Sequence, residues 1–234
     1  MDKLNLILLP GLVNDSRLYE NQVAALSHVV DATVGDLTMA DSMPALAASV
    51  LAKAPLRFAL AGLSMGGYVA LEIMRQAPER VSALALLDTS ARADTAESTV
   101  NRRRLMELAQ KDFNAVVDAL LPKMFHPSHL KDNSRAGVFK AMALAVGKDA
   151  FLRQQRAIIG RIDSRPYLDK IKCPTLVVCG REDAITPTEV HEELANNIRN
   201  AKMTIVNDCG HLSPLDQPQA VTAALQEWLL QKPH

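Results

Sequence analysis

The sequence predicts a three-layer α/β domain, in which helices cover both faces of about six mostly parallel strands. Short runs rich in Leu, Val and Ile alternate with longer segments whose apolar residues recur at helical spacing. Most of the short runs are apolar at successive positions, which is typical of strands covered on both faces. One long stretch of helical pattern interrupts the alternation and predicts a helical cap inserted after the fourth strand.

Six segments have the composition of buried strands. The first is apolar and stops at Pro10-Gly11, without the basic residues or the cleavage site of a signal peptide. We therefore expect it to be the first strand of the sheet. The expected strands are residues 4–9, 29–34, 57–61, 83–87, 175–179 and 202–206.

The segments between these strands begin with residues that favour helix starts. Asp15 and Ser42 each precede an amphipathic run and are expected to cap it. Residues 186–189 (Thr-Pro-Thr-Glu) have the form of a capping box with proline at the first helical position. These patterns predict helices that connect the strands and cover the sheet.

Residues 91–168 depart from this rhythm. Their apolar residues keep helical spacing, no strand-like run appears, and the stretch is far too long for a simple crossover connection. We therefore expect a core made of residues 1–90 and 169–234. Residues 91–168 would form a helical cap on the sheet, as an insertion and not as an independent domain.

Composition excludes several classes of protein. The 26 basic residues balance the 26 acidic ones and aromatic residues make up only 4%, which argues against nucleic-acid binding. No apolar run reaches the length of about 18 residues that a membrane span needs. Cys173, Cys179 and Cys209 lack C-x-x-C spacing and predict neither disulfides nor a zinc site. We expect a cytoplasmic protein without a nucleic-acid or membrane partner.

A G-x-S-x-G motif at residues 62–66 carries the first chemical indication. It follows directly on a strand and precedes a helix, so Ser64 would lie on a tight turn with its hydroxyl at the carboxyl end of the sheet. Side chains at Gly62 and Gly66 would collide with the neighbouring strand and helix. The motif alone is weakly specific, because a serine hydroxyl is a poor nucleophile without a base.

Six histidines are candidates for that base. His211 lies between the last strand and the last helix, which brings it to the same edge of the sheet as Ser64. His126 and His129 lie in the cap, where their spacing could suggest a metal, but no third ligand accompanies them and surface positions are favoured. The remaining three have no chemical context: His28, His191 and His234.

The base in turn needs an anion that fixes its tautomer. Asp183 follows the fifth strand in a short loop before a capped helix, and the order Ser64, Asp183, His211 is that of nucleophile-elbow hydrolases. Glu182 is adjacent but expected to point elsewhere. Asp88, after the fourth strand, is the competitor, although the following Thr-Ser pair favours a turn with local hydrogen bonds to its carboxylate.

Taken together, these motifs resemble the α/β-hydrolase fold, specifically its small carboxylesterase and lactonase-like branch with a helical cap. The resemblance covers nearly the whole chain outside the cap and is carried by residues 62–67, 180–187 and 209–214. It implies a serine hydrolase that cleaves a small carboxylic ester through an acyl-enzyme on Ser64. Alternatives are an enol-lactone, an acyl-carrier methyl ester or a carbon–carbon bond as substrate, or a ligand receptor without turnover.

The sequence departs from this family pattern at its start. Family members commonly begin with an antiparallel hairpin, whereas this chain begins at the strand before the oxyanion loop, so all strands are expected to be parallel. That loop usually starts with His-Gly, and here residues 9–12 are Leu-Pro-Gly-Leu. Because the oxyanion donors are backbone N–H groups, we expect Leu12 and Met65 to supply them.

Substrate contacts are less clearly indicated. Met124 and Phe125 of the cap are candidates for an acyl pocket, and Arg92 could hold a substrate carboxylate. Arg102-Arg103-Arg104 could dock an acidic acyl-carrier protein, although a solvent-exposed face of a cap helix is the simpler interpretation. No phosphate loop or set of metal ligands occurs, so neither a cofactor nor a metal is expected.

Overall fold

The computed structural model describes residues 3–131 and 133–230, and within them six strands form one parallel sheet of order β2-β1-β3-β4-β5-β6. The predicted number of strands and their parallel arrangement are therefore confirmed. The strands are β1 Leu4–Leu9, β2 Val30–Val34, β3 Phe58–Leu63, β4 Val81–Leu87, β5 Thr175–Gly180 and β6 Ala201–Val206.

Strand β3 runs two residues further than its apolar pattern predicts. Its end stays in the sheet because Gly62 pairs with Leu86 and Leu63 pairs with Leu87 of β4. The strand consequently leads straight into Ser64, with no loop between the sheet and the candidate nucleophile.

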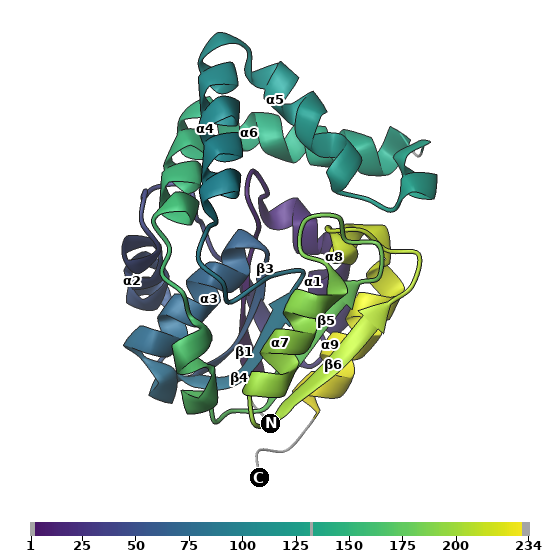
Figure 1. Cartoon of the computed structure of the whole chain (residues 1–234). Helices are drawn as coiled ribbons and strands as arrows, with labels where there is room; N and C mark the ends of the chain where they lie inside the picture. Colours follow the sequence, from purple (N-terminus) through teal and green to yellow (C-terminus); the bar gives the residue numbers. More distant parts are fainter. Residues whose placement is uncertain (1–2, 132, 231–234) are drawn as a thin grey trace.

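Helices cover both faces of the sheet, as alternate residues of β1 demonstrate. Leu6 and Leu8 pack in one apolar cluster with α1 and α9, whereas Ile7 and Leu9 pack in a second cluster with α2, α3 and α7. Figure 1 shows the resulting three layers. These helices are α1 Glu20–Leu26, α2 Met43–Lys53, α3 Met65–Gln76, α7 Thr188–Asn197 and α9 Pro218–Leu229, and a short α8 Ser213–Asp216 precedes the last one.

The expected helical insertion lies between β4 and β5. Three helices, α4 Ala96–Lys111, α5 Phe113–Leu120 and α6 Asn133–Ile159, lie over the carboxyl ends of the strands (Figure 1). Helix α6 is interrupted at Gly147, whose φ of 78° is left-handed. No helix in the described part of the chain is both long and apolar enough to cross a membrane.

Short 3₁₀ segments complete the connections between these elements, and they lie at the borders of the core helices and within the cap. In the core, Ser16–Tyr19 leads into α1 and Pro78–Arg80 leads into β4. The 3₁₀ segments of residues 91–174 are Leu121–Lys123, Pro127–Lys131 and Arg165–Lys170.

The helix starts follow the expectation in two of three places. Ser42 caps α2 by accepting a hydrogen bond from the N–H of Ala45, and Asp15 caps a 3₁₀ turn before α1. The predicted capping box at residues 186–189 is wrong. Pro187 is the N-cap of α7 without a side-chain bond, because the Thr186 hydroxyl donates to Asp183 instead.

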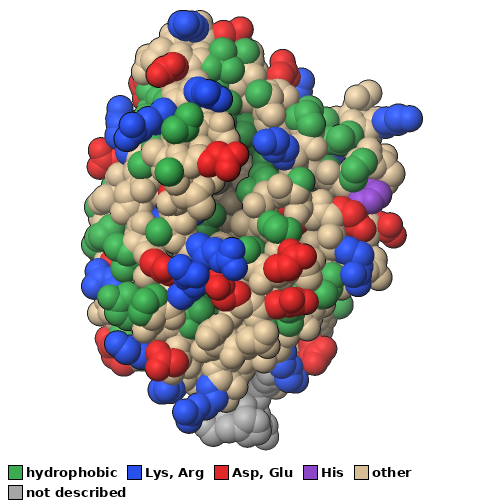
Figure 2. Space-filling model, in the orientation of Figure 1, with side chains coloured by type: hydrophobic (Ala, Val, Ile, Leu, Met, Phe, Trp, Pro, Cys, Tyr) green, Lys and Arg blue, Asp and Glu red, His purple; other side chains and the backbone are tan. Residues whose placement is uncertain are grey.

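Charged side chains are interspersed over the face drawn in Figure 2. Blue and red groups alternate there, and the basic groups do not gather into one continuous patch. This distribution agrees with the balance of 26 basic and 26 acidic residues in the sequence.

Candidate active site

Ser64 stands alone between β3 and α3 in a strained backbone conformation. Its φ is 52°, in the left-handed region that a serine seldom adopts. A side chain at Gly62 would overlap the backbone of Gly66, and one at Gly66 would overlap the carbonyl of Leu9. The two glycines thus permit a turn tight enough to present the Ser64 hydroxyl at the sheet edge.

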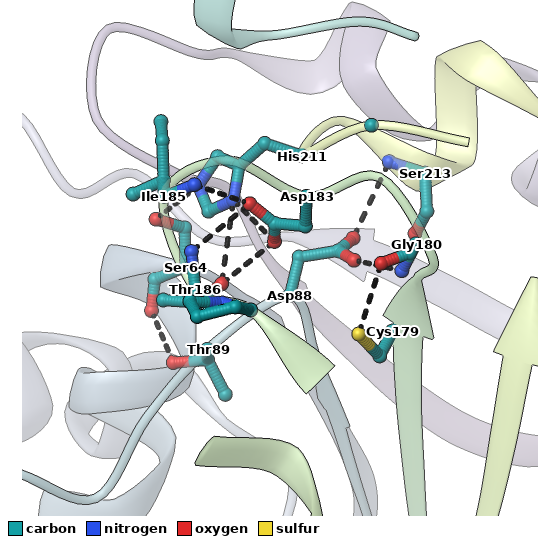
Figure 3. A network of polar contacts seen from close by, with 12 residues as sticks. Ser64, Asp88, Thr89, Cys179, Gly180, Asp183, Ile185, Thr186, His211 and Ser213 are labelled. Carbon is teal, nitrogen blue, oxygen red and sulfur yellow. Dashed lines mark hydrogen bonds and ion pairs between the residues drawn. The ribbon is translucent and has the colours of Figure 1, made fainter. Parts of the chain in front are cut away.

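The structure brings Ser64, His211 and Asp183 together at this edge, from the ends of β3, β6 and β5. The Oγ of Ser64 lies 2.9 Å from Nε2 of His211, and Nδ1 of His211 lies 2.8 Å from Oδ2 of Asp183 (Figure 3). With the ring proton on Nδ1, His211 donates to Asp183 and accepts from the serine hydroxyl. This is the geometry in which a serine can transfer its proton to a base.

Asp183 is held by donors from its own loop. Its Oδ1 accepts hydrogen bonds from the N–H groups of Ile185 and Thr186, and its Oδ2 also accepts from the Thr186 hydroxyl at 2.7 Å. Burial raises the pKa of Asp183, but the charge of His211 and these hydrogen bonds outweigh burial and lower the pKa overall. The carboxylate is therefore ionised and fixed in direction.

The pKa of His211 is also set by burial against neighbouring charges, and here the charges raise it. Burial lowers the pKa of this fully buried ring, whereas the charge and hydrogen bond of Asp183 and the charge of Asp88 raise it. The net effect is a pKa above the ordinary value for histidine. Ionised neighbours thus stabilise the protonated ring, which is the form that a proton transfer from Ser64 would produce.

Asp88 lies beside this group without touching His211. It is fully buried, and its oxygens accept hydrogen bonds from the N–H groups of Gly180 and Ser213 (Figure 3). The expected local bonds from the residues that follow it are wrong, because packing against β5 and α8 brings distant donors closer. Burial, followed by the charge of Asp183, raises the pKa of Asp88 to about 7.

The other residues near Ser64, His211 and Asp183 have structural partners. Glu182 points away as expected and accepts from the N–H of Cys209. Burial raises the pKa of the Cys209 thiol, so that this cysteine is not a reactive thiolate. His28 lies outside the site at the end of α1, and His234 lies outside the described residues.

His191 is a residue of this region that the sequence pattern did not single out. Its Nδ1 lies 3.2 Å from the carbonyl of Pro187, and its Nε2 accepts a hydrogen bond from the N–H of Thr89. The Thr89 hydroxyl in turn donates to the carbonyl of Ser64. Burial lowers the pKa of His191 to about 4, so the ring is neutral and supports the turn at Ser64 through Thr89.

Asp88, Asp183 and His191 have ligand-type atoms within 4.8 Å of one another, which raises the question of a metal site. Every carboxylate oxygen and ring nitrogen of the three is already bonded to a protein group. Both ring nitrogens of His191 are occupied, so this residue could bind a metal ion only by giving up the hydrogen bond from Thr89.

The cap is fastened to the loop that carries His211. Asp216 accepts from the N–H groups of His126 and Gly210, and one of its oxygens lies 2.7 Å from Nδ1 of His129. The N–H of Leu212 donates to the carbonyl of Met124. Of the two cap histidines considered above as metal ligands or surface residues, His129 joins the contact between cap and core through its ring. His126 joins it only through its backbone N–H, and its ring lies 2.7 Å from the Ser128 hydroxyl.

A second fastening joins the cap to the loop after β1. The fully buried Gln154 of α6 accepts a hydrogen bond from the N–H of Val13 and donates to the carbonyl of Leu37. No described residue accepts a hydrogen bond from the backbone N–H of Leu12 or of Met65. Met65 follows Ser64 in the chain, and Leu12 lines the same cavity as Ser64, so both N–H groups belong to residues near its hydroxyl.

A cavity of about 180 Å³ adjoins Ser64 and His211 and is roofed by the cap. Of the predicted substrate contacts, Met124 lines it, together with Leu12 of the loop after β1. Phe125 does not line it and packs edge-to-face on Phe139 within the cap, with ring centres 6.5 Å apart. Arg92 lines a different cavity and pairs with Glu193 at 2.8 Å.

Comparison with known proteins gives the family. Residues 6–225 match the model of the alpha/beta hydrolase family. A curated relative, the pimeloyl-[acyl-carrier protein] methyl ester esterase of Nitrosomonas europaea, is 26% identical, with 92% of this chain and 91% of that protein covered.

Two solved structures are also similar over nearly the whole chain. A thermophilic esterase from Thermogutta terrifontis, solved with malate bound, has a TM-score of 0.89 at 29% identity and covers 97% of this chain and 89% of its own. The enol-lactonase from Burkholderia xenovorans LB400 has a TM-score of 0.90 at 25% identity, with 99% and 93% covered. With the family model matched over most of its length, the chain belongs to the alpha/beta hydrolase family.

Proposed function

We propose that this protein is a serine hydrolase that cleaves a small carboxylic ester through an acyl-enzyme on Ser64. The observation that carries the proposal is the continuous hydrogen-bonded series from Ser64 through His211 to Asp183, with distances of 2.9 and 2.8 Å. The similarity of this chain to an esterase, to an enol-lactonase and to a methyl ester esterase also supports ester hydrolysis.

In the proposed reaction, Oγ of Ser64 attacks the ester carbonyl carbon while Nε2 of His211 accepts the hydroxyl proton. The tetrahedral intermediate then collapses, the bond to the alcohol oxygen breaks, and His211 returns the proton to the leaving alcohol. A water molecule repeats the sequence on the acyl-enzyme and releases the acid. Asp183 stabilises the imidazolium in both halves without taking its proton.

Leu12 and Met65 are the proposed oxyanion donors. Their backbone N–H groups are without a partner in the described part of the chain, and Met65 begins α3, whose dipole favours negative charge at this end. Gln154 holds the N–H of the neighbouring Val13, which fixes the loop that carries Leu12. Donors of this kind contribute about 10²–10³-fold each to turnover.

Covalent labelling tests this assignment. A serine-directed phosphonate or sulfonyl fluoride is expected to add one adduct per chain at Ser64, located by intact-protein and peptide mass spectrometry. Ser64→Ala is expected to abolish labelling and to lower turnover by about 10⁴–10⁶-fold. An adduct on another residue of the folded protein would refute the nucleophile. Ligand binding without any turnover would favour a receptor on the same fold.

We further propose that the ester is small. The cavity volume of about 180 Å³ and the fastening of the cap to the His211 loop favour short acyl groups. Turnover of aryl esters of increasing acyl length is expected to peak below ten carbons. A maximum at ten carbons or more, measured by release of the phenol, would contradict a confined site.

An acyl-carrier methyl ester stays within the proposal as a variant, because one relative has that activity by name. Of the three arginines considered for a carrier protein, Arg103 and Arg104 are exposed on α4, whereas Arg102 turns inward. An enol-lactone is a second variant, by similarity to the enol-lactonase. A cytoplasmic location remains a prediction from the sequence.

A further inference from the structure

The cavity beside Ser64 has an uneven distribution of charge. Among the described residues that line it, Arg102 and Lys123 are cations and none is a carboxylate. Asp183 is turned away from the cavity wall, behind the ring of His211. A cavity with this lining favours a negatively charged group over a neutral one, since charges within a partly buried site are weakly screened.

Arg102 belongs to a buried network with an excess of positive charge. Its Nε lies 3.1 Å from Oδ1 of Asp94, and Nη1 of Arg161 lies 2.9 Å from the same oxygen. The Asp94 side chain is only 1% exposed, so two guanidinium groups share one buried carboxylate. One positive charge at the edge of the cavity therefore stays uncompensated within this network.

Gln155 adds a directed hydrogen-bond donor beside that charge. Its Oε1 accepts from Nη1 of Arg102 at 3.1 Å, which fixes the orientation of the amide and leaves Nε2 as the free end. Gln155 is fully buried and lines the cavity, and its Nε2 has no hydrogen-bond partner among residues 3–131 and 133–230. A buried donor without an acceptor is costly, so such a group points to an acceptor supplied by a ligand.

Asn14 lies in the same lining on the side of the core. It follows the loop that carries Leu12, its side chain is buried, and its Nδ2 likewise lacks a partner in the described part of the chain. Two buried amide donors without a partner and two cations thus line one cavity with the candidate nucleophile. Carboxylate oxygens are the acceptors that guanidinium and amide N–H groups bind best.

We propose that the substrate carries, in addition to the ester that Ser64 attacks, a carboxylate that Arg102 and Gln155 bind. This proposal rests on the proposed serine hydrolase function and narrows its substrate to half-esters of short dicarboxylic acids. Arg102 supplies the charge, Gln155 supplies a donor whose direction is fixed, and Met124 contacts the carbon chain between the two groups.

A pair of matched esters tests the proposal. Monomethyl glutarate carries a carboxylate where methyl 5-methylhexanoate carries an isopropyl group of similar shape. Methanol release at constant ionic strength gives kcat/KM for each ester. The wild type is expected to prefer the half-ester by roughly tenfold or more, since hydrogen bonds to charged groups are the stronger ones.

Three variants locate the preference. Arg102→Met and Gln155→Met each keep the side-chain volume and are expected to lower the ratio of half-ester to neutral ester by roughly tenfold, mainly through KM for the half-ester. Lys111→Met removes a cation from the exposed end of the same helix and is the matched control, with both rates unchanged. Thermal unfolding of each variant shows whether the fold is retained.

The outcomes separate this proposal from the one on which it rests. A wild type that hydrolyses the neutral ester as well as the half-ester overturns the carboxylate site and leaves the serine hydrolase in place. A preference that survives both Arg102→Met and Gln155→Met overturns the assignment to these residues. Labelling of Ser64 without turnover of either ester overturns the substrate class, whereas absence of labelling refutes the hydrolase itself.

Discussion

The loops after β4 and β5 each present one buried aspartate at the same edge of the sheet, but the two carboxylates have different partners. Asp183 receives three hydrogen bonds from Ile185 and Thr186 within its own loop and binds His211 with the same carboxylate. Asp88 receives one bond from Gly180 and one from Ser213, which belong to other segments of the chain.

The difference shows that position at the sheet edge does not by itself decide which carboxylate serves the histidine. Local donors and the positive ring lower the pKa of Asp183, whereas burial and the neighbouring charge of Asp183 raise the pKa of Asp88 to about 7. Two adjacent buried carboxylates resist ionising together. Asp88 therefore links the end of β4 to β5 and α8 through hydrogen bonds, whereas Asp183 carries the charge that faces His211.

The largest expected effect separates the two aspartates directly. Asp183→Asn keeps the shape of the side chain but removes the charge that faces Nδ1 of His211 and favours the wrong tautomer, so turnover is expected to fall by about 10⁴-fold. Ester hydrolysis by folded protein at a single pH measures the effect. If Asp88→Asn shows the large loss of turnover and Asp183→Asn does not, the carboxylate that serves His211 is Asp88.

A smaller loss is expected when the local donors of Asp183 are reduced. Thr186→Val keeps the shape of the side chain and removes the hydroxyl that lies 2.7 Å from Oδ2, so the carboxylate is less firmly held. Turnover is expected to fall by about tenfold, in proportion to one hydrogen bond to a charged group. Thr188→Val, in the first turn of α7, is the matched control. Equal rates for the two variants would show that the Thr186 hydroxyl does not help to position the Asp183 carboxylate.

Asp88→Asn is expected to retain turnover within a few-fold and to change its pH dependence. The charge of Asp88 is one of the causes that raise the pKa of His211, so a neutral side chain lowers that pKa. Because the neutral ring of His211 is the proposed base, the acid limb of kcat/KM is expected to move to lower pH. A limb that stays in place, or moves to higher pH, would show that Asp88 does not act on His211 through charge.

The smallest expected effect concerns metal chelation. The oxygens of both aspartates and the ring nitrogens of His191 all have protein partners, and His191 could bind a metal ion only by giving up its hydrogen bond from Thr89. Activity after treatment with EDTA is expected to equal that of untreated protein. A large loss that is restored by a divalent cation would contradict this view of the two aspartates.

The sequence by itself determined the fold and the meeting of three side chains. Apolar runs that alternate with helical segments specify parallel strands, and the carboxyl ends of parallel strands lie on one edge. The segments that follow β3, β5 and β6 therefore lie at the same edge, where Ser64, Asp183 and His211 meet. The tight turn at Ser64 is equally local, because two glycines at fixed spacing permit it.

Only the tertiary structure decided the partners of the remaining groups. The pattern at residues 186–189 indicates a capping box. In the fold, Asp183 lies within hydrogen-bond distance of the Thr186 hydroxyl, which donates to this carboxylate and does not cap the helix. His191 has no chemical context in the sequence. In the fold, the loop after β4 lies against it, and the N–H of Thr89 donates a hydrogen bond to its ring.

The same holds for the walls of the cavity. From the sequence, Arg92 is the candidate for a substrate carboxylate, and Arg102 is considered only as part of an exposed surface for a carrier protein. In the structure, Arg92 pairs with Glu193 and Arg102 reaches the cavity beside Ser64. Which arginine faces the site depends on how α4 and α6 pack over the sheet, since Gln155 and Asp94 orient the side chain. Contacts between segments so far apart in the chain produce no periodic pattern in the sequence. They depend on how the helices of the cap pack.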